Sequence, residues 1–184
     1  MSEDRLIAAT VGKVEPLNDS ITLAPYSPEW PLRYAALERQ IRRALGSRAL
    51  LIEHVGSTSV PGLCAKPIID IVLAVADSAK ENAYLPPLEA LGYVLRIREP
   101  DWFEHRMLKA PVIEGNIHVF SRGCAEIDRV LAFRDWLCSN DDDRALYERT
   151  TQELAARTWK HVQDYADAKS EIVKVILARA LAAR

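Results

Sequence analysis

The sequence predicts an α+β fold: a mixed β-sheet with flanking helices, followed by a helical carboxyl-terminal third. Short runs rich in isoleucine and valine, typical of buried strands, are confined to the first 125 residues. From residue 126 onward, apolar residues recur at helical spacing instead. The chain has 184 residues, 49% of them hydrophobic, which suffices for one domain with a substantial core. We expect residues 1–20 to form a loosely held lead-in and residues 21–184 a single domain, with its sheet at 21–125 and its helical part at 126–184.

Strand character is concentrated in a few short segments that turn residues separate. The two most apolar of them are rich in isoleucine and valine and read as buried strands. Three later ones are joined by turns at Pro100 and at Gly115. The expected strands are residues 50–55, 68–75, 93–98, 102–108 and 116–121, with a shorter one at 21–23.

Helices are expected on both sides of these strands. The first begins near Pro31, where a missing N–H costs little, and ends at Gly46. Residues 78–91 have a helical pattern, but Pro86 and Pro87 divide it, so that helix is expected to begin at the prolines. After residue 126 the apolar spacing predicts three amphipathic helices.

Composition and charge exclude several classes of protein. A net charge of −2 lacks the basic excess typical of nucleic-acid binders, and no apolar run is long enough to span a membrane. The acidic start of the chain lacks the pattern of a secretory signal. Cys64, Cys124 and Cys138 are widely spaced, as expected for reduced thiols rather than disulfides or a zinc site. We therefore expect a cytoplasmic protein whose partner is a small molecule.

The loop after the first buried strand suits a phosphate. Gly56 permits close approach of the backbone, and Ser57, Thr58 and Ser59 add three hydroxyls and successive N–H groups. A capped turn, in which the serines only satisfy the backbone, explains the same residues about equally well. A Walker A loop is excluded, because Gly62 is not followed by the required Lys and Ser/Thr.

Asp70 and His118 are the candidates for catalysis. Asp70 lies in an otherwise apolar strand, where a carboxylate must meet a cation, a metal or several donors. In the structural alternative its partner is Lys66 or a nearby arginine, and in the functional interpretation its partner is Mg²⁺. His118 shares a strand face with Asn116, although a lone strand histidine is more often structural. Arg106 and Lys109, on a neighbouring strand, are candidates to face phosphates, with simple exposure as the alternative.

Several longer motifs resemble the GrpB-type family, a branch of the nucleotidyltransferase-fold superfamily. The resemblance covers nearly everything after residue 20. Its central block is the longest and most specific part, running from the Gly-Ser loop to Asp70. The matching motifs are residues 25–30 (PYSPEW), 53–63 (EHVGSTSVPGL), 66–70 (KPIID), 117–119 (IHV), 133–137 (FRDWL) and 165–170 (YADAKS).

The resemblance implies a nucleotidyltransferase-like mixed sheet in which the Gly-Ser loop holds a triphosphate. In active superfamily members, an Asp-x-Asp pair and a third acid hold two Mg²⁺ ions for attack on the α-phosphate. This chain departs from that pattern. Val72 stands where the second acid belongs, and the strand expected to carry the third acid carries His118. Asp70 remains the predicted metal ligand, with His118 as a second ligand or an acid–base group.

The resemblance also singles out residues of the helical part. Arg134, Tyr165 and Lys169 are candidates for the substrate side of the site, whereas support of their own helices is the alternative. Together with Lys66 beside the phosphates, these residues predict a protein that binds a nucleoside triphosphate or another phosphorylated molecule with Mg²⁺. Transfer of a nucleotidyl group to an acceptor is the enzymatic version of this hypothesis. The alternative is a catalytically degenerate module that binds a nucleotide, a cofactor or a protein.

Overall fold

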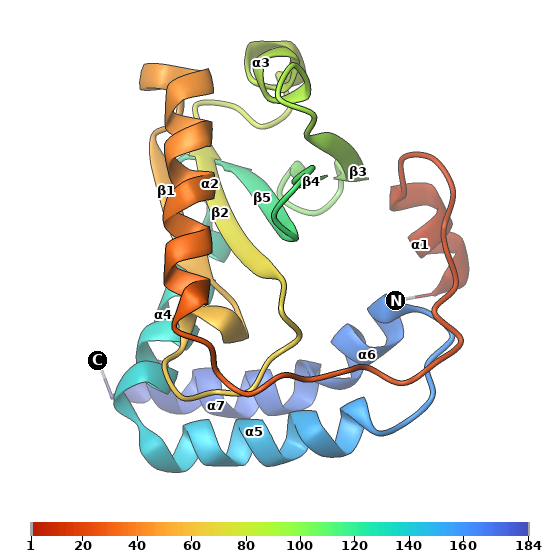
Figure 1. The fold of residues 1–184 in the computed structure, drawn as a ribbon, viewed down its shortest axis with the longest axis vertical. Coiled ribbons are helices and arrows are strands. Elements are labelled where there is room, and N and C mark those ends of the chain that lie inside the picture. The colour runs from red at the N-terminus through yellow and green to blue at the C-terminus, as the bar shows by residue number, and fades with distance from the viewer. Residues whose placement is uncertain (1, 184) are drawn as a thin grey trace.

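Residues 2–183 are described by the computed structural model, and five strands of this part form one mixed sheet (Figure 1). The order across the sheet is β1-β2-β5-β4-β3, with β2 and β5 parallel and every other pair antiparallel. The predicted α+β class is therefore confirmed. The strands are β1 (Leu51–Val55), β2 (Ile69–Val75), β3 (Val94–Glu99), β4 (His105–Lys109) and β5 (Gly115–Ser121).

Helices precede, flank and follow the sheet. Figure 1 shows α2 along one side of β1 and β2, with α5 and α7 side by side below the strands. In the described chain, none of the helices combines the length and apolar character needed to cross a membrane. The helices are α1 (Glu3–Ala9), α2 (Glu29–Leu45), α3 (Leu85–Glu89), α4 (Ala125–Ser139), α5 (Asp141–Ala155), α6 (Val162–Ala168) and α7 (Ser170–Ala182), with short 3₁₀ turns at Gly46–Arg48, Ser57–Ser59 and Glu81–Ala83.

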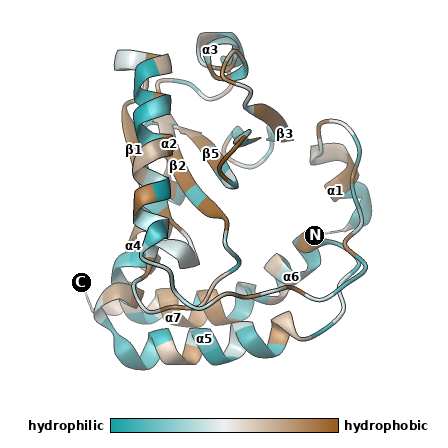
Figure 2. Ribbon diagram, in the orientation of Figure 1, coloured by the Kyte–Doolittle hydropathy of each residue, from teal (hydrophilic) through white to brown (hydrophobic). Residues whose placement is uncertain are grey.

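The main core lies between α2 and one face of the sheet. Because side chains alternate along a strand, the odd-numbered residues of β2 and β5 point to this face. They meet the apolar stripe of α2, and the strands at the centre of Figure 2 are correspondingly hydrophobic. The fully buried members of this core include Leu37, Ile41, Ile69, Ile71, Leu73, Leu108 and Ile117.

The opposite face of the sheet is divided into two parts. Val72, Ala74 and Phe120 are covered by α4, through Ile127 and its neighbours. The other part of the same face carries Asp70 and is left to polar residues. One half of this face is thus core, and the other half is available to a ligand.

The described part of the amino-terminal segment is more ordered than the loose lead-in that we expected over residues 1–20, of which residue 1 lies outside the described residues. Glu3–Ala9 form α1, and the backbone after it bonds to β3: Thr10 bridges Ile97, and the Val11 N–H donates to the Arg96 carbonyl at 2.8 Å. In Figure 1, α1 (red) lies beside β3 and apart from α2. The segment is short and lacks a sustained period, so its order comes from these tertiary contacts.

Three smaller differences concern the ends of elements. Residues 21–23 form no strand; the adjacent Ala24 makes an isolated bridge to Ala65 instead. The strand expected over residues 102–108 begins at His105, because the chain turns before it and Glu104 has a φ of 51°. The last of the three predicted helices is divided at Lys169 into α6 and α7.

Candidate functional site

A cavity of about 500 Å³ lies against the uncovered half of the sheet. Its floor is formed by β2, β5, β4 and β3, and its walls by α1, α6 and the loop that follows β1. The volume is in the range of small-molecule sites, which hold ligands of nucleotide size. Most of the sequence-predicted site residues line it: Ser57, Thr58, Lys66, Asp70, His118, Tyr165 and Lys169.

Asp70, Asn116 and His118 form the polar floor of the cavity. The parallel register places Asp70 opposite Asn116 and Val72 opposite His118, so all four side chains point to one face. Asn116 Nδ2 donates to Asp70 Oδ1 at 2.9 Å, and His118 Nε2 lies 3.8 Å from the same oxygen. The Asp70 and His118 side chains are each 32% exposed, which leaves both accessible from the cavity.

The charge of Asp70 is stabilised by its neighbours. Burial works to raise its pKa, but the positive charge of His118 when that imidazole is protonated, the hydrogen bond from Asn116 and the charge of Lys169 outweigh it. The pKa of Asp70 is therefore lowered from its ordinary value. A carboxylate in this position stays ionised, so it can accept a hydrogen bond or bind a cation.

Gly56 packs directly against Asp70. Its φ of 70° and ψ of −175° are values that essentially only glycine adopts. A Cβ at this position would lie 2.7 Å from Asp70 Oδ2 and 3.2 Å from Asp70 Cβ. Glycine is thus required both by the backbone conformation and by the approach of the carboxylate.

The three hydroxyls of the loop are used differently. Ser57 lines the cavity, with its Oγ 3.4 Å from the hydroxyl of Tyr147 on α5. Thr58 is buried, where its Oγ1 donates to the Ile68 carbonyl. Ser59 Oγ donates to the Gly56 carbonyl at 2.5 Å. The capped-turn interpretation therefore describes the contacts of Thr58 and Ser59, and Ser57 is the hydroxyl best placed for a ligand.

Lysines give the cavity a positive rim. Lys66 follows the loop, Lys109 ends β4 beside Asn116, and Lys169 lies at the junction of α6 and α7. Burial and the nearby Lys109 charge lower the pKa of Lys66. Lys169 Nζ lies 4.5 Å from the ring centre of Tyr165. Burial works to lower the pKa of Lys169, but the Tyr147 and Tyr165 hydroxyls and Asp70 outweigh burial, so the pKa is raised. This arrangement attracts an anionic ligand.

Two histidines and a glutamate form a hydrogen-bonded chain that the sequence analysis did not single out. His118 Nδ1 lies 3.1 Å from His105 Nε2, and His105 Nδ1 lies 2.8 Å from Glu99 Oε2. His105, Glu99 and Lys109 all line the cavity. Strand alternation places His105 and Lys109 on one face of β4, but the pairing of β4 with β5 and β3 cannot be read from one sequence.

Arg106 and Arg134 are not brought to the cavity. Arg106 points to the α2 face, where it is 5% exposed and its Nε donates to Glu81 Oε1 at 2.5 Å. Arg134 joins α4 to β1, since its Nη1 donates to Glu53 Oε2 at 2.8 Å and to the His54 carbonyl at 2.9 Å. These contacts of Arg134 correspond to the alternative considered above, in which the residue has a structural role and does not contact the substrate.

The donor set suits one magnesium ion that arrives with a phosphate ligand. Magnesium commonly takes one or two carboxylates and completes its shell with phosphate oxygens and water. Asp70 can supply one ligand, but residues 2–183 contain no cluster of three His, Cys, Asp or Glu side chains that could hold a metal. Val72, at the position of the second acid, is 1% exposed and packs in the apolar cluster under α4. A two-metal centre therefore does not fit this site.

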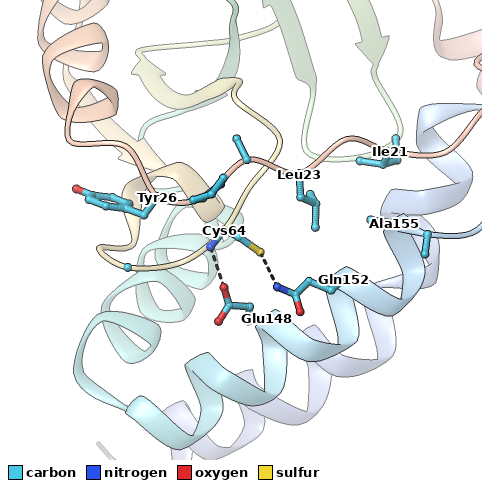
Figure 3. A pocket seen from close by; sticks show the side chains of 11 residues that line it. Ile21, Leu23, Tyr26, Cys64, Glu148, Gln152 and Ala155 are labelled. Carbon is cyan, nitrogen blue, oxygen red and sulfur yellow. Dashed lines mark hydrogen bonds between the residues drawn. The ribbon is translucent and has the colours of Figure 1, made fainter.

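A second hollow, of about 510 Å³, lies between residues 21–26 and α5 (Figure 3). Figure 3 shows that Cys64, one of its lining residues, is joined to α5: the Cys64 N–H donates to Glu148 Oε1 at 3.1 Å and Gln152 Nε2 donates to Cys64 Sγ at 3.5 Å. Burial raises the pKa of the Cys64 thiol, which disfavours the reactive thiolate. The candidate site is therefore the cavity over the sheet.

Comparison with known proteins identifies the family of this chain. A protein-family model described as GrpB protein matches residues 20–179. The chain belongs to the GrpB family. A UPF0157 protein of Halalkalibacterium halodurans is 57% identical over 179 residues, which are 97% of this chain and 92% of that relative. The sequence-based assignment to the GrpB family is thus confirmed.

Two solved structures resemble this chain to different degrees. The conserved protein GrpB from Enterococcus faecalis has a TM-score of 0.77 and 29% identity, over 87% of this chain and 97% of that one. The Cid1 poly(U) polymerase in its MgGTP-bound form has a TM-score of 0.47 and 11% identity, over 70% of this chain and 45% of the polymerase. The likeness of fold therefore rests on the Enterococcus faecalis structure.

Proposed function

We propose that this GrpB protein binds a phosphate-bearing small molecule, a nucleoside triphosphate in the first instance, in the cavity over the sheet. One observation carries the proposal: Asp70, Asn116 and His118 meet on the floor of a cavity rimmed by lysines. Charge-assisted hydrogen bonds from lysine are among the strongest contacts that a phosphate makes in a protein. A site built only for an apolar ligand would not need them.

The remaining walls suit the less polar part of such a ligand. Leu6, Ala9 and Val14 come from the amino-terminal segment, and Val162 and Ala166 from α6. Small-molecule sites commonly combine an apolar lining with a few polar groups that fix orientation. The phosphates would lie beside the lysines and Ser57, with the base or another apolar group toward α1.

His118 would act as the proton acceptor at the polar end. In a nucleotidyl transfer, an acceptor hydroxyl would give its proton to His118 Nε2 as its oxygen bonds to the α-phosphorus, and pyrophosphate would leave with the electron pair of the broken P–O bond. Asp70, 3.8 Å from Nε2, would stabilise the imidazolium so formed. A magnesium ion held by Asp70 and the ligand's own phosphates would offset negative charge. Lys66 and Lys169 would do the same from the protein.

The direct test is isothermal titration calorimetry with the four common nucleoside triphosphates and with tripolyphosphate, each with and without Mg²⁺. We expect binding by the wild type, with the magnesium-dependent part lost in Asp70→Asn. Lys169→Gln should weaken binding about tenfold to a hundredfold, as expected for one charged hydrogen bond. Lys174→Gln is the matched control, because Lys174 lies on α7 and its side chain is 70% exposed.

Two results would contradict the proposal. The first is a well-folded protein that binds none of these ligands. The second is binding that Lys169→Gln and Lys174→Gln weaken equally, since this would indicate a general effect of charge rather than contact in the cavity. Thermal melting of each variant shows whether a loss of binding reflects unfolding.

The alternative, binding without group transfer, is favoured by Val72. Its burial in the apolar cluster removes the second carboxylate from the position where a two-metal site would need it. Incubation with a labelled triphosphate and a panel of acceptor hydroxyls distinguishes the two versions. Release of pyrophosphate that His118→Asn abolishes would support transfer, whereas tight binding without turnover would support the binding module.

A further inference from the structure

The hydrogen-bonded side chains of Glu99, His105 and His118 come from three neighbouring strands. Glu99 ends β3, His105 begins β4 and His118 is in the middle of β5. A register shift in β3 between Leu95 and Ile97 brings Glu99 opposite His105. One extra residue in β3 thus places the carboxylate within reach of the imidazole.

The direction of the hydrogen bonds follows from chemistry. An ionised carboxylate only accepts, so His105 Nδ1 must carry the proton that it donates to Glu99 Oε2. A neutral imidazole has one donor and one acceptor, so His105 Nε2 then accepts. His118 Nδ1 is 3.1 Å from that acceptor and must be the donor. In the neutral imidazole of His118, this leaves Nε2 without a proton. Burial, which exceeds the opposing effect of Glu99, lowers the pKa of His105 and favours its neutral form.

The geometry at Asp70 agrees with this assignment. A protonated Nε2 beside a carboxylate would form a short charge-assisted hydrogen bond. The distance from His118 Nε2 to Asp70 Oδ1 is 3.8 Å, too long for a hydrogen bond. Both side chains are 32% exposed, so a ligand group can approach both atoms from the cavity.

Packing prevents His105 from turning away. Its side chain is 5% exposed, and its ring stacks on Phe120 at 4.8 Å and on His118 at 5.3 Å between ring centres. The Trp102 ring packs edge-on against it at 5.2 Å. A ring held on several sides keeps its hydrogen-bonding nitrogens fixed.

We propose that Glu99 and His105 are positioning residues that hold His118 in the Nδ1–H tautomer, with the Nε2 lone pair facing the cavity. The role of that lone pair as proton acceptor rests on the proposed function. The tautomer itself is a property of the free protein. Neither Glu99 nor His105 is required to touch the ligand.

The test is a two-dimensional ¹H–¹⁵N correlation spectrum of histidine-labelled protein without ligand, recorded at mildly alkaline pH, where imidazoles are neutral. The two ring nitrogens have distinct shifts in the two tautomers. We expect the Nδ1–H tautomer for His118 in the wild type and its loss in His105→Phe, which keeps a stacked ring but removes the acceptor. Glu99→Gln retains an accepting oxygen and should keep the tautomer, whereas Glu99→Leu should lose it.

A wild-type His118 in the Nε2–H form would overturn the inference, as would an unchanged tautomer in both His105→Phe and Glu99→Leu. If His105→Phe fails to fold, the comparison of Glu99→Gln with Glu99→Leu still decides the matter, because Glu99 is partly accessible at the end of its strand. Failure of the proposed function gives a different pattern: the tautomer is as expected, but no phosphate ligand binds.

Discussion

Replacement of Gly56 by alanine tests the contact on which the site is built. Two costs add in this variant. The backbone conformation, with φ at 70° and ψ at −175°, costs a non-glycine residue about 1–3 kcal/mol. The new Cβ would also lie 2.7 Å from Asp70 Oδ2, so the carboxylate must move. That movement is opposed by the hydrogen bond from Asn116 to the other oxygen of Asp70.

The total should exceed the effect of backbone strain alone. Forcing an extra carbon into a packed site costs about 1–3 kcal/mol, so we expect Gly56→Ala to destabilise the protein by about 2–6 kcal/mol. Gly62→Ala is the matched control. Gly62 has a φ of 80°, but a Cβ there meets no atom within 4 Å, so only the cost of the left-handed backbone, about 1–2 kcal/mol, applies.

Urea denaturation followed by circular dichroism measures the free energy of unfolding of both variants. Calorimetry with the ligand found for the wild type measures their affinity. Gly56→Ala should lose affinity because Asp70 is displaced, whereas Gly62→Ala should keep it. The same substitution made in an Asp70→Ala background should cost less, because the carboxylate is gone. Equal stability and equal affinity of Gly56→Ala and Gly62→Ala would refute the reasoning.

Three further predictions concern other parts of the molecule. Hydrogen bonds from Arg98 and then Arg106 lower the pKa of Glu81 to about 2. The ionised carboxylate therefore contributes no more than about 3 kcal/mol to the free energy of unfolding. This contribution is complete above the ordinary pKa of 4.5 and is lost as the pH falls toward 2. The difference in unfolding free energy between wild type and Glu81→Gln should therefore shrink below about pH 4.5, and a constant difference would contradict this assignment. Arg134→Leu should destabilise the protein by about 1–3 kcal/mol in urea, because its carboxylate partner on β1 loses a charged donor, while ligand affinity stays unchanged. Deletion of residues 2–9 should remove one wall of the cavity and weaken ligand binding, yet leave cooperative melting, which differential scanning calorimetry would show.

The sequence predicted the α+β class because its signals are local. The isoleucine and valine runs around β1 and β2 and the helical spacing after residue 126 each depend on neighbours in the chain. Gly56 and Asp70 could be singled out for the same reason, since a glycine in a hydroxyl-rich loop and a lone acid in an apolar strand are anomalies that need no partner to be noticed. The GrpB family followed from motifs of this kind.

Other features depended on the pairing of strands far apart in sequence. The register of β4 against β5 places His105 beside His118, and the bulge in β3 places Glu99 beside His105. Face assignment likewise separated Arg106, which pairs with Glu81 on the α2 side, from Lys109 at the cavity. A one-residue change of register moves every side chain of a strand to the other face, and one sequence does not show which strands pair. The sequence by itself determined the fold class and the chemical types available, whereas tertiary packing decided which of those groups meet on one face of the sheet.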